Sequence, residues 1–210
     1  MSILSEDNDN TRPPKSPESD HVQMTADRMA AVWIQTWSGE KFHPFFPNPA
    51  EVKICDIAHA LSNICRFTGH TDEFYSVAQH CVLVSEQVPL EHAFAALLHD
   101  ASEAYLSDIA MPVKPWLLNY RQVELNLMLA ISLAFDFDWP PDESIHQADM
   151  RLQATEARDL MGGTKFDGLP DPYPFKIEPW EPKKARSMFM RRFKELAGPD
   201  AFEPISIKYE

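Results

Sequence analysis

Apolar residues recur at helical spacing along most of the chain from residue 53 onward. In ICDIAHALSNICRF, residues 54–67, apolar side chains fall at i, i+3, i+4 and i+7 starting from Ile54, as in a helix with one apolar face. Further segments with helical patterning cover residues 75–88, 90–106, 116–135, 143–161 and 183–196. Prolines and paired glycines separate several of these segments. The pattern predicts an all-α fold, a helical bundle of about six helices.

Two segments near the N-terminus depart from helical patterning. Residues 32–52 alternate Val32, Ile34 and Thr36 before a Ser-Gly turn, which predicts a short N-terminal hairpin or an extended lid. Residues 1–23 are rich in Ser, Asp, Asn, Glu and Pro and carry few large apolar side chains. Such a segment cannot bury enough surface to offset the entropy of ordering, so it predicts a disordered acidic tail. Residues 24–210 are predicted to form a single domain.

The charge balance limits the partners that the protein can bind. With 19 Lys and Arg against 32 Asp and Glu, the formal net charge of −13 repels a nucleic-acid backbone and an anionic membrane surface. A small anionic ligand stays compatible with this charge, because a bound cation and a few basic groups reverse the local field. The three cysteines form no C-x-x-C pair, and there is no apolar run of the roughly 18 residues that span a bilayer. We therefore expect a cytoplasmic protein with no polymeric nucleic acid or membrane as partner.

Four residues with metal-binding side chains stand in three separate amphipathic segments. They are His80, His99, Asp100 and Asp149. Two imidazoles and two carboxylates can occupy four positions around a divalent cation and still leave space for water and substrate. Facing helices of a bundle are a natural frame for such a site. The alternative is that the histidines are core residues with ordinary hydrogen bonds.

Two further carboxylates lie close to this set in the stretch AALLHDASEAYLSD, residues 95–108. Glu103 stands one helical turn after His99 on the same face, from where it could take a proton from an attacking water. Asp108 follows five residues later, where it could position that water or the leaving group. The alternative for both is a solvated surface charge.

The segments YSVAQH, LLHDASEAYLSDIAMPVK and QADMRLQATEARDL together resemble the HD superfamily of metal-dependent phosphohydrolases. The signature of that superfamily is a His, then His-Asp, then a distant Asp, and the resemblance covers about residues 53–160. It implies an HD-domain helical bundle with His80, His99, Asp100 and Asp149 as metal ligands and Glu103 and Asp108 as catalytic carboxylates. Ser107 stands before Asp108 where relatives often have Gly. Nitrogen and carboxylate ligands with open positions suit one divalent metal ion such as Mn, Co, Fe, Ni or Mg.

The same resemblance indicates substrate contacts. Arg66 and Phe67 stand fourteen and thirteen residues before His80, and they match an Arg-aromatic pair with which relatives hold a nucleotide. The Arg fork suits phosphate oxygens, and the Phe ring offers a face for a sugar or base. Lys114 could supply a second phosphate contact. The alternatives are that Arg66 pairs with an acidic residue and that Lys114 is solvated.

Another carboxylate, Glu156, is followed two residues later by Arg158. Both charges are interpreted as members of local salt bridges on a helix.

Within the superfamily, the chain is similar to bacterial 5'-deoxynucleotidases and phage deoxynucleoside triphosphate triphosphohydrolases. The similarity implies attack on the phosphorus next to the 5' oxygen of a small deoxynucleotide, releasing deoxynucleoside plus phosphate or triphosphate. Alternatives are a nucleotide-binding sensor without turnover and an HD phosphodiesterase for another phosphoester. Because relatives are often dimers or larger rings, the resemblance also allows a homo-oligomer.

Overall fold

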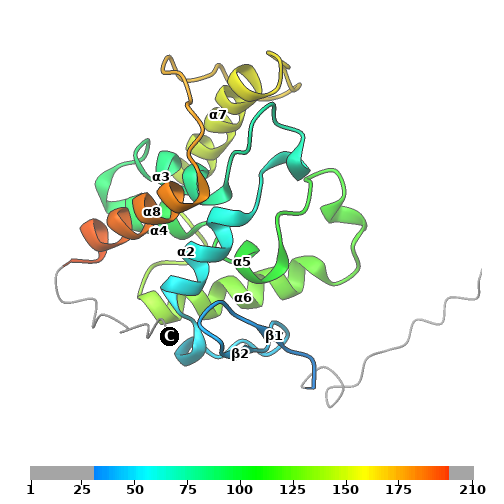
Figure 1. Cartoon of the computed structure of the whole chain (residues 1–210), viewed down its shortest axis with the longest axis vertical. Coiled ribbons are helices and arrows are strands. Elements are labelled where there is room, and N and C mark those ends of the chain that lie inside the picture. Colours follow the sequence, from blue (N-terminus) through cyan, green and yellow to red (C-terminus); the bar gives the residue numbers. More distant parts are fainter. Residues whose placement is uncertain (1–30, 199–210) are drawn as a thin grey trace, which may run out of the picture.

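The computed structural model describes residues 31–198, and within that range the chain is mostly helical (Figure 1). The α-helices are α2 (Ile54–Asn63), α3 (Val77–Ser85), α4 (Ala93–Leu98), α5 (Glu103–Leu106), α6 (Tyr120–Phe135), α7 (Glu143–Leu160) and α8 (Pro182–Ala197). Short 3-10 turns are η1 (Pro49–Glu51), η2 (Phe67–Gly69), η3 (Leu90–His92) and η4 (Lys114–Trp116). The all-α prediction is confirmed, and the predicted tail of residues 1–23 lies outside the described residues.

Two of the predicted helices are shorter than their apolar patterns. The helix predicted from Ile54, which is α2, ends at Asn63. The backbone N–H of Arg66 donates to the Tyr75 carbonyl at 2.9 Å and does not continue the helical hydrogen bonds. The segment predicted over residues 90–106 divides into η3, α4 and α5, with a break between His99 and Ser102. Both breaks fall where the sequence carries candidate site residues.

The predicted hairpin is present near the N-terminal edge of the described chain. Strands β1 (Ile34–Gln35) and β2 (Lys41–Phe42) pair antiparallel, with Ile34 opposite Phe42. The turn is fixed to α2, since the backbone N–H and the hydroxyl of Ser38 donate to Asp56 at 2.6 and 2.9 Å. The Phe42 ring also stacks on Tyr105 of α5, with centroids 4.0 Å apart. In Figure 1 the hairpin and α7 lie at opposite ends of the molecule.

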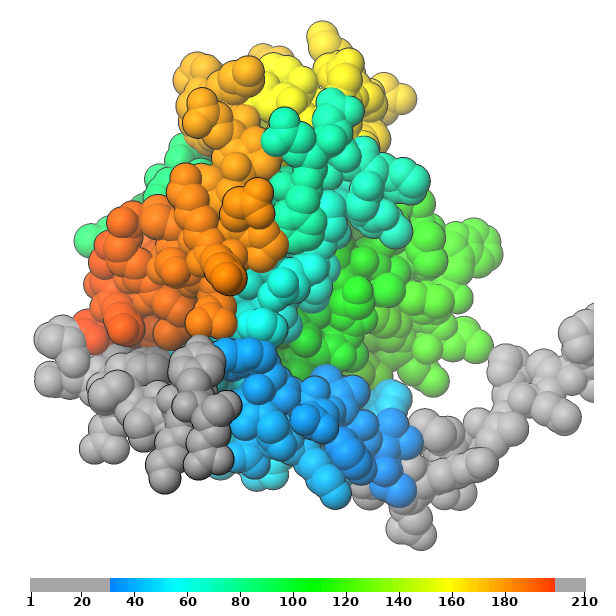
Figure 2. Space-filling view, viewed as in Figure 1, coloured from blue at the N-terminus to red at the C-terminus, as the bar shows by residue number. Residues whose placement is uncertain are grey.

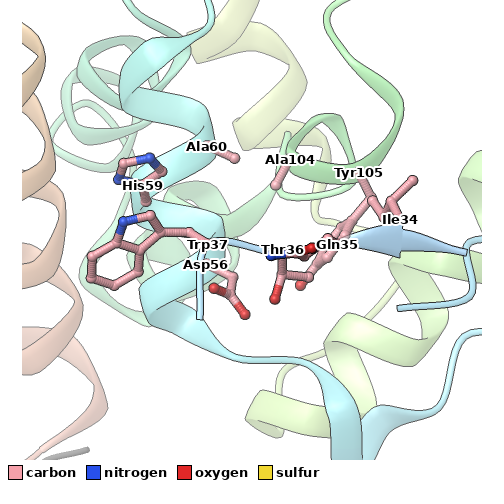
Figure 3. Close-up of a pocket in the computed structure, with 9 residues that line it drawn as sticks. All are labelled: Ile34, Gln35, Thr36, Trp37, Asp56, His59, Ala60, Ala104 and Tyr105. Carbon is pink, nitrogen blue, oxygen red and sulfur yellow. The ribbon is translucent and has the colours of Figure 1, made fainter. Parts of the chain in front are cut away.

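A pocket of about 340 Å³ lies between the hairpin and helices α2 and α5 (Figure 3). Trp37 stacks on His59 in its wall, with ring centroids 4.9 Å apart, and Asp56 and Tyr105 are also among the lining residues. None of its lining residues is a predicted site residue.

Helix α8 closes the core on the side facing α2, α3 and α4. Its buried face consists of Ala185, Phe189 and Phe193, spaced four residues apart, as expected for an amphipathic helix. These side chains pack in one cluster with Ile57 and Leu61 of α2. Figure 2 shows α8 and the segment before it, in orange and red, covering this side of the molecule. Among residues 31–198, no helix is both long and apolar enough to cross a membrane.

Candidate metal centre

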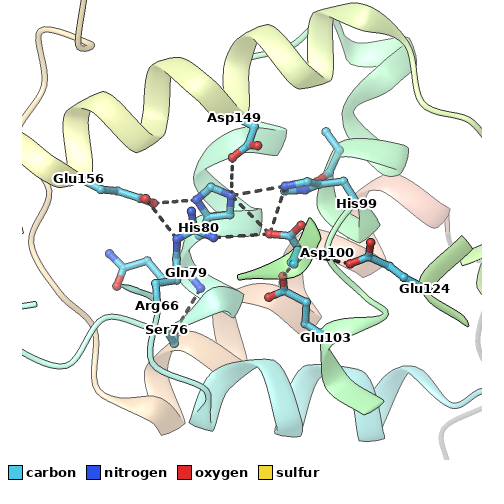
Figure 4. A network of polar contacts seen from close by, with 12 residues as sticks. Arg66, Ser76, Gln79, His80, His99, Asp100, Glu103, Glu124, Asp149 and Glu156 are labelled. Atoms are coloured by element: carbon cyan, nitrogen blue, oxygen red, sulfur yellow. Dashed lines mark hydrogen bonds and ion pairs between the residues drawn. The ribbon is translucent and has the colours of Figure 1, made fainter. Parts of the chain in front are cut away.

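The structure brings the four predicted metal ligands together from three helical regions (Figure 4). His80 lies in α3, whose N-terminus is capped by Ser76, and its side chain is completely buried. His80 Nε2 lies 3.1 Å from Asp149 Oδ1 on α7 and 3.4 Å from His99 Nε2, just after α4. Asp100 Oδ2 is 3.6 Å from His80 Nε2 and 3.3 Å from His99 Nε2. The helix break after α4 therefore places His99 and Asp100 beside the same point.

Ligand atoms of His80, His99 and Asp149 all lie within 4.8 Å of one another, close enough to share one cation. Within the described part of the chain, a second group with the same spacing consists of Cys81, His99 and Asp100. The sequence interpretation did not include Cys81 among the ligands. Both groups share His99, so they describe one centre that could hold one metal ion.

The hydrogen bonds of the two histidines fit a cation at this point. His99 Nδ1 lies 2.7 Å from the Ala96 carbonyl, which can only accept, so this nitrogen carries the ring proton. His80 Nδ1 lies 2.7 Å from a Glu156 carboxylate oxygen, which favours a proton there as well. With Nδ1 as the donor in both rings, each Nε2 would be left to direct its lone pair at a bound cation. Two lone pairs and two carboxylates converging on one point are the donor set of a divalent cation.

The electrostatics around His80 also favour positive charge. Burial and the neighbouring Arg66 lower the pKa of His80, but the carboxylates of Glu156 and Asp149 outweigh them and raise it to about 9. Burial raises the pKa of Asp149, whereas the hydrogen bond from His80 and the charges of His80 and His99 hold it below its usual range. Without a cation the cluster therefore favours a second proton on His80, which a bound cation would displace.

Glu156 is a residue of the centre that the sequence interpretation missed. It is completely buried, with one oxygen 2.7 Å from His80 Nδ1 and the other 3.1 Å from Arg66 Nε. The predicted local salt bridge was wrong for Glu156, because the buried face of α7 directs it toward α3 and Arg66. Arg158 instead bonds its neighbour Asp159 at 2.7 Å. The spacing of seven residues, two helical turns, from Asp149 is a sequence signal that could have placed Glu156 on the ligand face.

We expect Glu156→Gln to weaken divalent-cation binding by about 10- to 100-fold, as found when the carboxylate partner of a ligating histidine is removed. The amide keeps the side-chain volume but loses the negative charge and one of the two acceptor oxygens that bond His80 and Arg66. Calorimetric titration with Mn²⁺ measures the change, and the exposed Glu143→Gln on the same helix is the control. Equal affinity of the Glu156 variant and the parent would show that this contact does not orient His80.

Glu103 begins α5 and is buried beside the cluster. One of its oxygens lies 3.6 Å from Lys114 Nζ, and the other, Oε2, is buried without a hydrogen-bond partner among residues 31–198. Burial raises the pKa of Glu103 well above its usual value, and the carboxylates of Asp100 and Asp108 raise it further. Lys114 is not simply solvated, since its Nζ also bonds Glu124 at 3.0 Å.

Asp108 follows a sharp turn after α5. Ser107 has a φ of 69°, a conformation that glycine adopts readily and serine rarely does. Asp108 is half-buried, and burial raises its pKa while the charge of Arg66 opposes this rise. The negative charge of Asp100 also raises the pKa of Asp108, as expected for two carboxylates that lie near the same cluster.

Arg66 and Phe67 lie in the turn after α2, not on the helix itself. The buried guanidinium of Arg66 bonds Glu156, as described above, and its Nη1 lies 3.5 Å from Asp100 Oδ2. It also lies 5.5 Å from the centre of the Phe67 ring. Arg66 does pair with acidic residues, and the same pairing holds it at the edge of the metal centre.

The chain is similar to two bacterial proteins. It is 42% identical over 170 residues to the uncharacterized protein YfdR of Escherichia coli (strain K12), a match that covers 79% of this chain and 96% of that protein. It is 32% identical over 163 residues to an uncharacterized protein of Rhodobacter capsulatus, covering 69% of this chain and 83% of that protein. No protein-family model matches the chain.

Proposed function

The chain belongs to the same protein family as YfdR of Escherichia coli, and we propose that it is an HD-type metal-dependent phosphohydrolase acting on small deoxynucleotides. The observation that carries this proposal is the convergence of His80, His99, Asp100 and Asp149 beside the buried carboxylate of Glu103. The buried Glu103 oxygen has no hydrogen-bond partner among residues 31–198, so it is available to a water or a substrate beside the cluster. The resemblance to the HD signature supports the same reaction class.

The four ligands account for one divalent cation, with Mn, Co, Fe, Ni and Mg as candidates. When bound, such an ion would lower the pKa of a water molecule and draw charge from a phosphoryl oxygen. The chain supplies the histidine orientation for this, since Glu156 and the Ala96 carbonyl fix the rings of His80 and His99.

Glu103 is the proposed general base. Its buried position raises its affinity for a proton, and its free oxygen Oε2 is available to accept one from the attacking water. Lys114, 3.6 Å from the other oxygen, orients the carboxylate. Asp108 is proposed to orient the same water or the leaving oxygen from the opposite end of α5.

Arg66 is the proposed phosphate-binding residue. Its Nε is held by Glu156, while Nη1 reaches the cluster beside Asp100, so the planar fork is fixed before a substrate arrives. It would neutralise charge on the non-bridging oxygens as water attacks the phosphorus next to the 5' oxygen. The same attack releases phosphate from a monophosphate and triphosphate from a triphosphate. The choice between these two substrates therefore depends on the groups around the outer phosphates, and Lys114 is a candidate for such a group.

The experiment removes metal with a chelator, restores Mn²⁺, Co²⁺, Fe²⁺, Ni²⁺ or Mg²⁺ separately, and supplies the four dNMPs and four dNTPs. Chromatography then resolves deoxynucleoside, phosphate and triphosphate. We expect metal-dependent release of deoxynucleoside together with either phosphate or triphosphate. Nucleotide binding without product under every metal would contradict the enzyme and favour a sensor.

A further inference from the structure

Phe67 and Phe166 form an aromatic pair that joins two segments far apart in the sequence. Their rings are nearly parallel, with an interplanar angle of 9° and centroids 6.3 Å apart. Phe67 stands directly after Arg66, whereas Phe166 belongs to the proline-rich loop between α7 and α8. The Phe166 ring is 40% exposed. The aromatic pair is therefore partly open to solvent, and Phe67 connects it to Arg66 at the edge of the centre described above.

The backbone at Phe67 adopts a strained conformation. Phe67 and Thr68 have φ angles of 53° and 56°, in the left-handed region that side chains other than glycine rarely occupy. Such strain persists only when the surrounding structure imposes it, and it concentrates at functional sites. Here the Asp72 N–H donates to the Leu160 carbonyl at the end of α7, at 2.8 Å. Figure 2 shows the surface of this segment bordering the yellow end of α7.

A series of contacts joins the metal centre to the aromatic pair. Arg66 Nη1 lies 3.5 Å from Asp100, the Arg66 guanidinium lies 5.5 Å from the Phe67 ring, and Phe67 stacks with Phe166. A ligand whose phosphate meets Arg66 at the cluster can therefore place its other end against the two rings. For a deoxynucleotide, that other end is the base.

We propose that Phe166, together with Phe67, forms the nucleobase subsite by stacking, so that the loop between α7 and α8 is part of the substrate-binding site. This inference rests on the proposed function and adds the part of the substrate that the metal centre does not contact. Stacking needs only a π face, which every base has. The subsite therefore accepts different bases and favours purines, whose larger rings cover more of the aromatic surface.

The test compares a substrate that carries a base with one that lacks it. Steady-state kinetics of the Mn²⁺-loaded full chain are measured with dAMP and with 2-deoxyribose 5-phosphate, for the parent, Phe166→Ala and Phe166→Tyr. We expect Phe166→Ala to raise KM for dAMP about tenfold, with kcat within about twofold and no change for 2-deoxyribose 5-phosphate. Phe166→Tyr keeps the ring and should retain the parent KM. Phe46→Ala, at an aromatic 49% exposed and outside the pair, is the matched control.

A binding measurement separates the subsite from catalysis. Deoxyadenosine is a product without a phosphate, so its dissociation constant can be measured by calorimetry without turnover. We expect Phe166→Ala to weaken deoxyadenosine binding about tenfold. If Phe166→Ala weakens deoxyadenosine binding but the parent hydrolyses neither substrate, the proposed enzyme is refuted and the subsite is supported. Equal KM changes for both substrates, or unchanged dAMP and deoxyadenosine values, would overturn the subsite while leaving phosphohydrolase activity in place.

Discussion

Replacing Glu103 by Gln is expected to lower kcat by a factor of about 10³ while the protein keeps its divalent cation. A positioned general base contributes about 10²- to 10⁴-fold to a rate. The amide has nearly the same shape as the carboxylate but cannot take a proton from water. Glu103 does not belong to either group of clustered ligand atoms in the described chain, so the cation should be unaffected.

Two measurements on the Glu103→Gln variant check this result: kcat with the best substrate and metal, and metal content after dialysis. The matched control is Glu124→Gln, which removes the other carboxylate bonded to Lys114 but leaves the base in place. We expect the control to keep kcat within a few-fold of the parent. If Glu103→Gln hydrolyses as fast as the parent, Glu103 is not the base. If it loses its cation, Glu103 acts as a ligand.

The candidate site was predictable from the sequence where each candidate residue carries its own local signal. His80, the His99-Asp100 pair and Asp149 stand out because polar groups interrupt apolar helical patterns, and the structure brings them within hydrogen-bond range. Such signals depend on helix periodicity, which the sequence contains. Glu103 was predicted from a one-turn spacing to His99 on one helix, but the helix breaks between these residues, and Glu103 lies beside the cluster at the start of α5.

Other parts of the site depend on contacts between distant segments. Glu156 bonds His80 across 76 positions of the chain, and in sequence it resembles any solvated helix charge near an arginine. The apolar pattern likewise continues through Ile64 and Cys65, although α2 ends at Asn63 because Arg66 pairs with Tyr75. The stacking of Phe67 with Phe166 is of the same kind. Tertiary pairing decides these features, and local propensity does not encode it.

Asp149→Ala is expected to abolish both tight cation binding and hydrolysis. Asp149 Oδ1 lies 3.1 Å from His80 Nε2, closer than the Asp100 oxygen at 3.6 Å. Asp149 also belongs to the group, with His80 and His99, in which every member is a predicted ligand. Loss of an outer-shell partner of a ligand costs about 10- to 100-fold in affinity, so loss of a ligand itself should exceed about 100-fold. The variant also removes negative charge that balances the cation.

Thermal unfolding of the Asp149→Ala variant with and without Mn²⁺ gives a readout that does not depend on activity. A cation that binds only the folded chain raises the melting temperature of the parent, and this rise should disappear in Asp149→Ala. His146→Ala, an exposed position on the same helix, should keep both the rise and the activity. A metal-free melting curve shows whether the variant is folded. If folded Asp149→Ala still gains as much stability from Mn²⁺ as the parent does, Asp149 is not a ligand. The cation would then bind at the other group of ligand atoms, Cys81, His99 and Asp100.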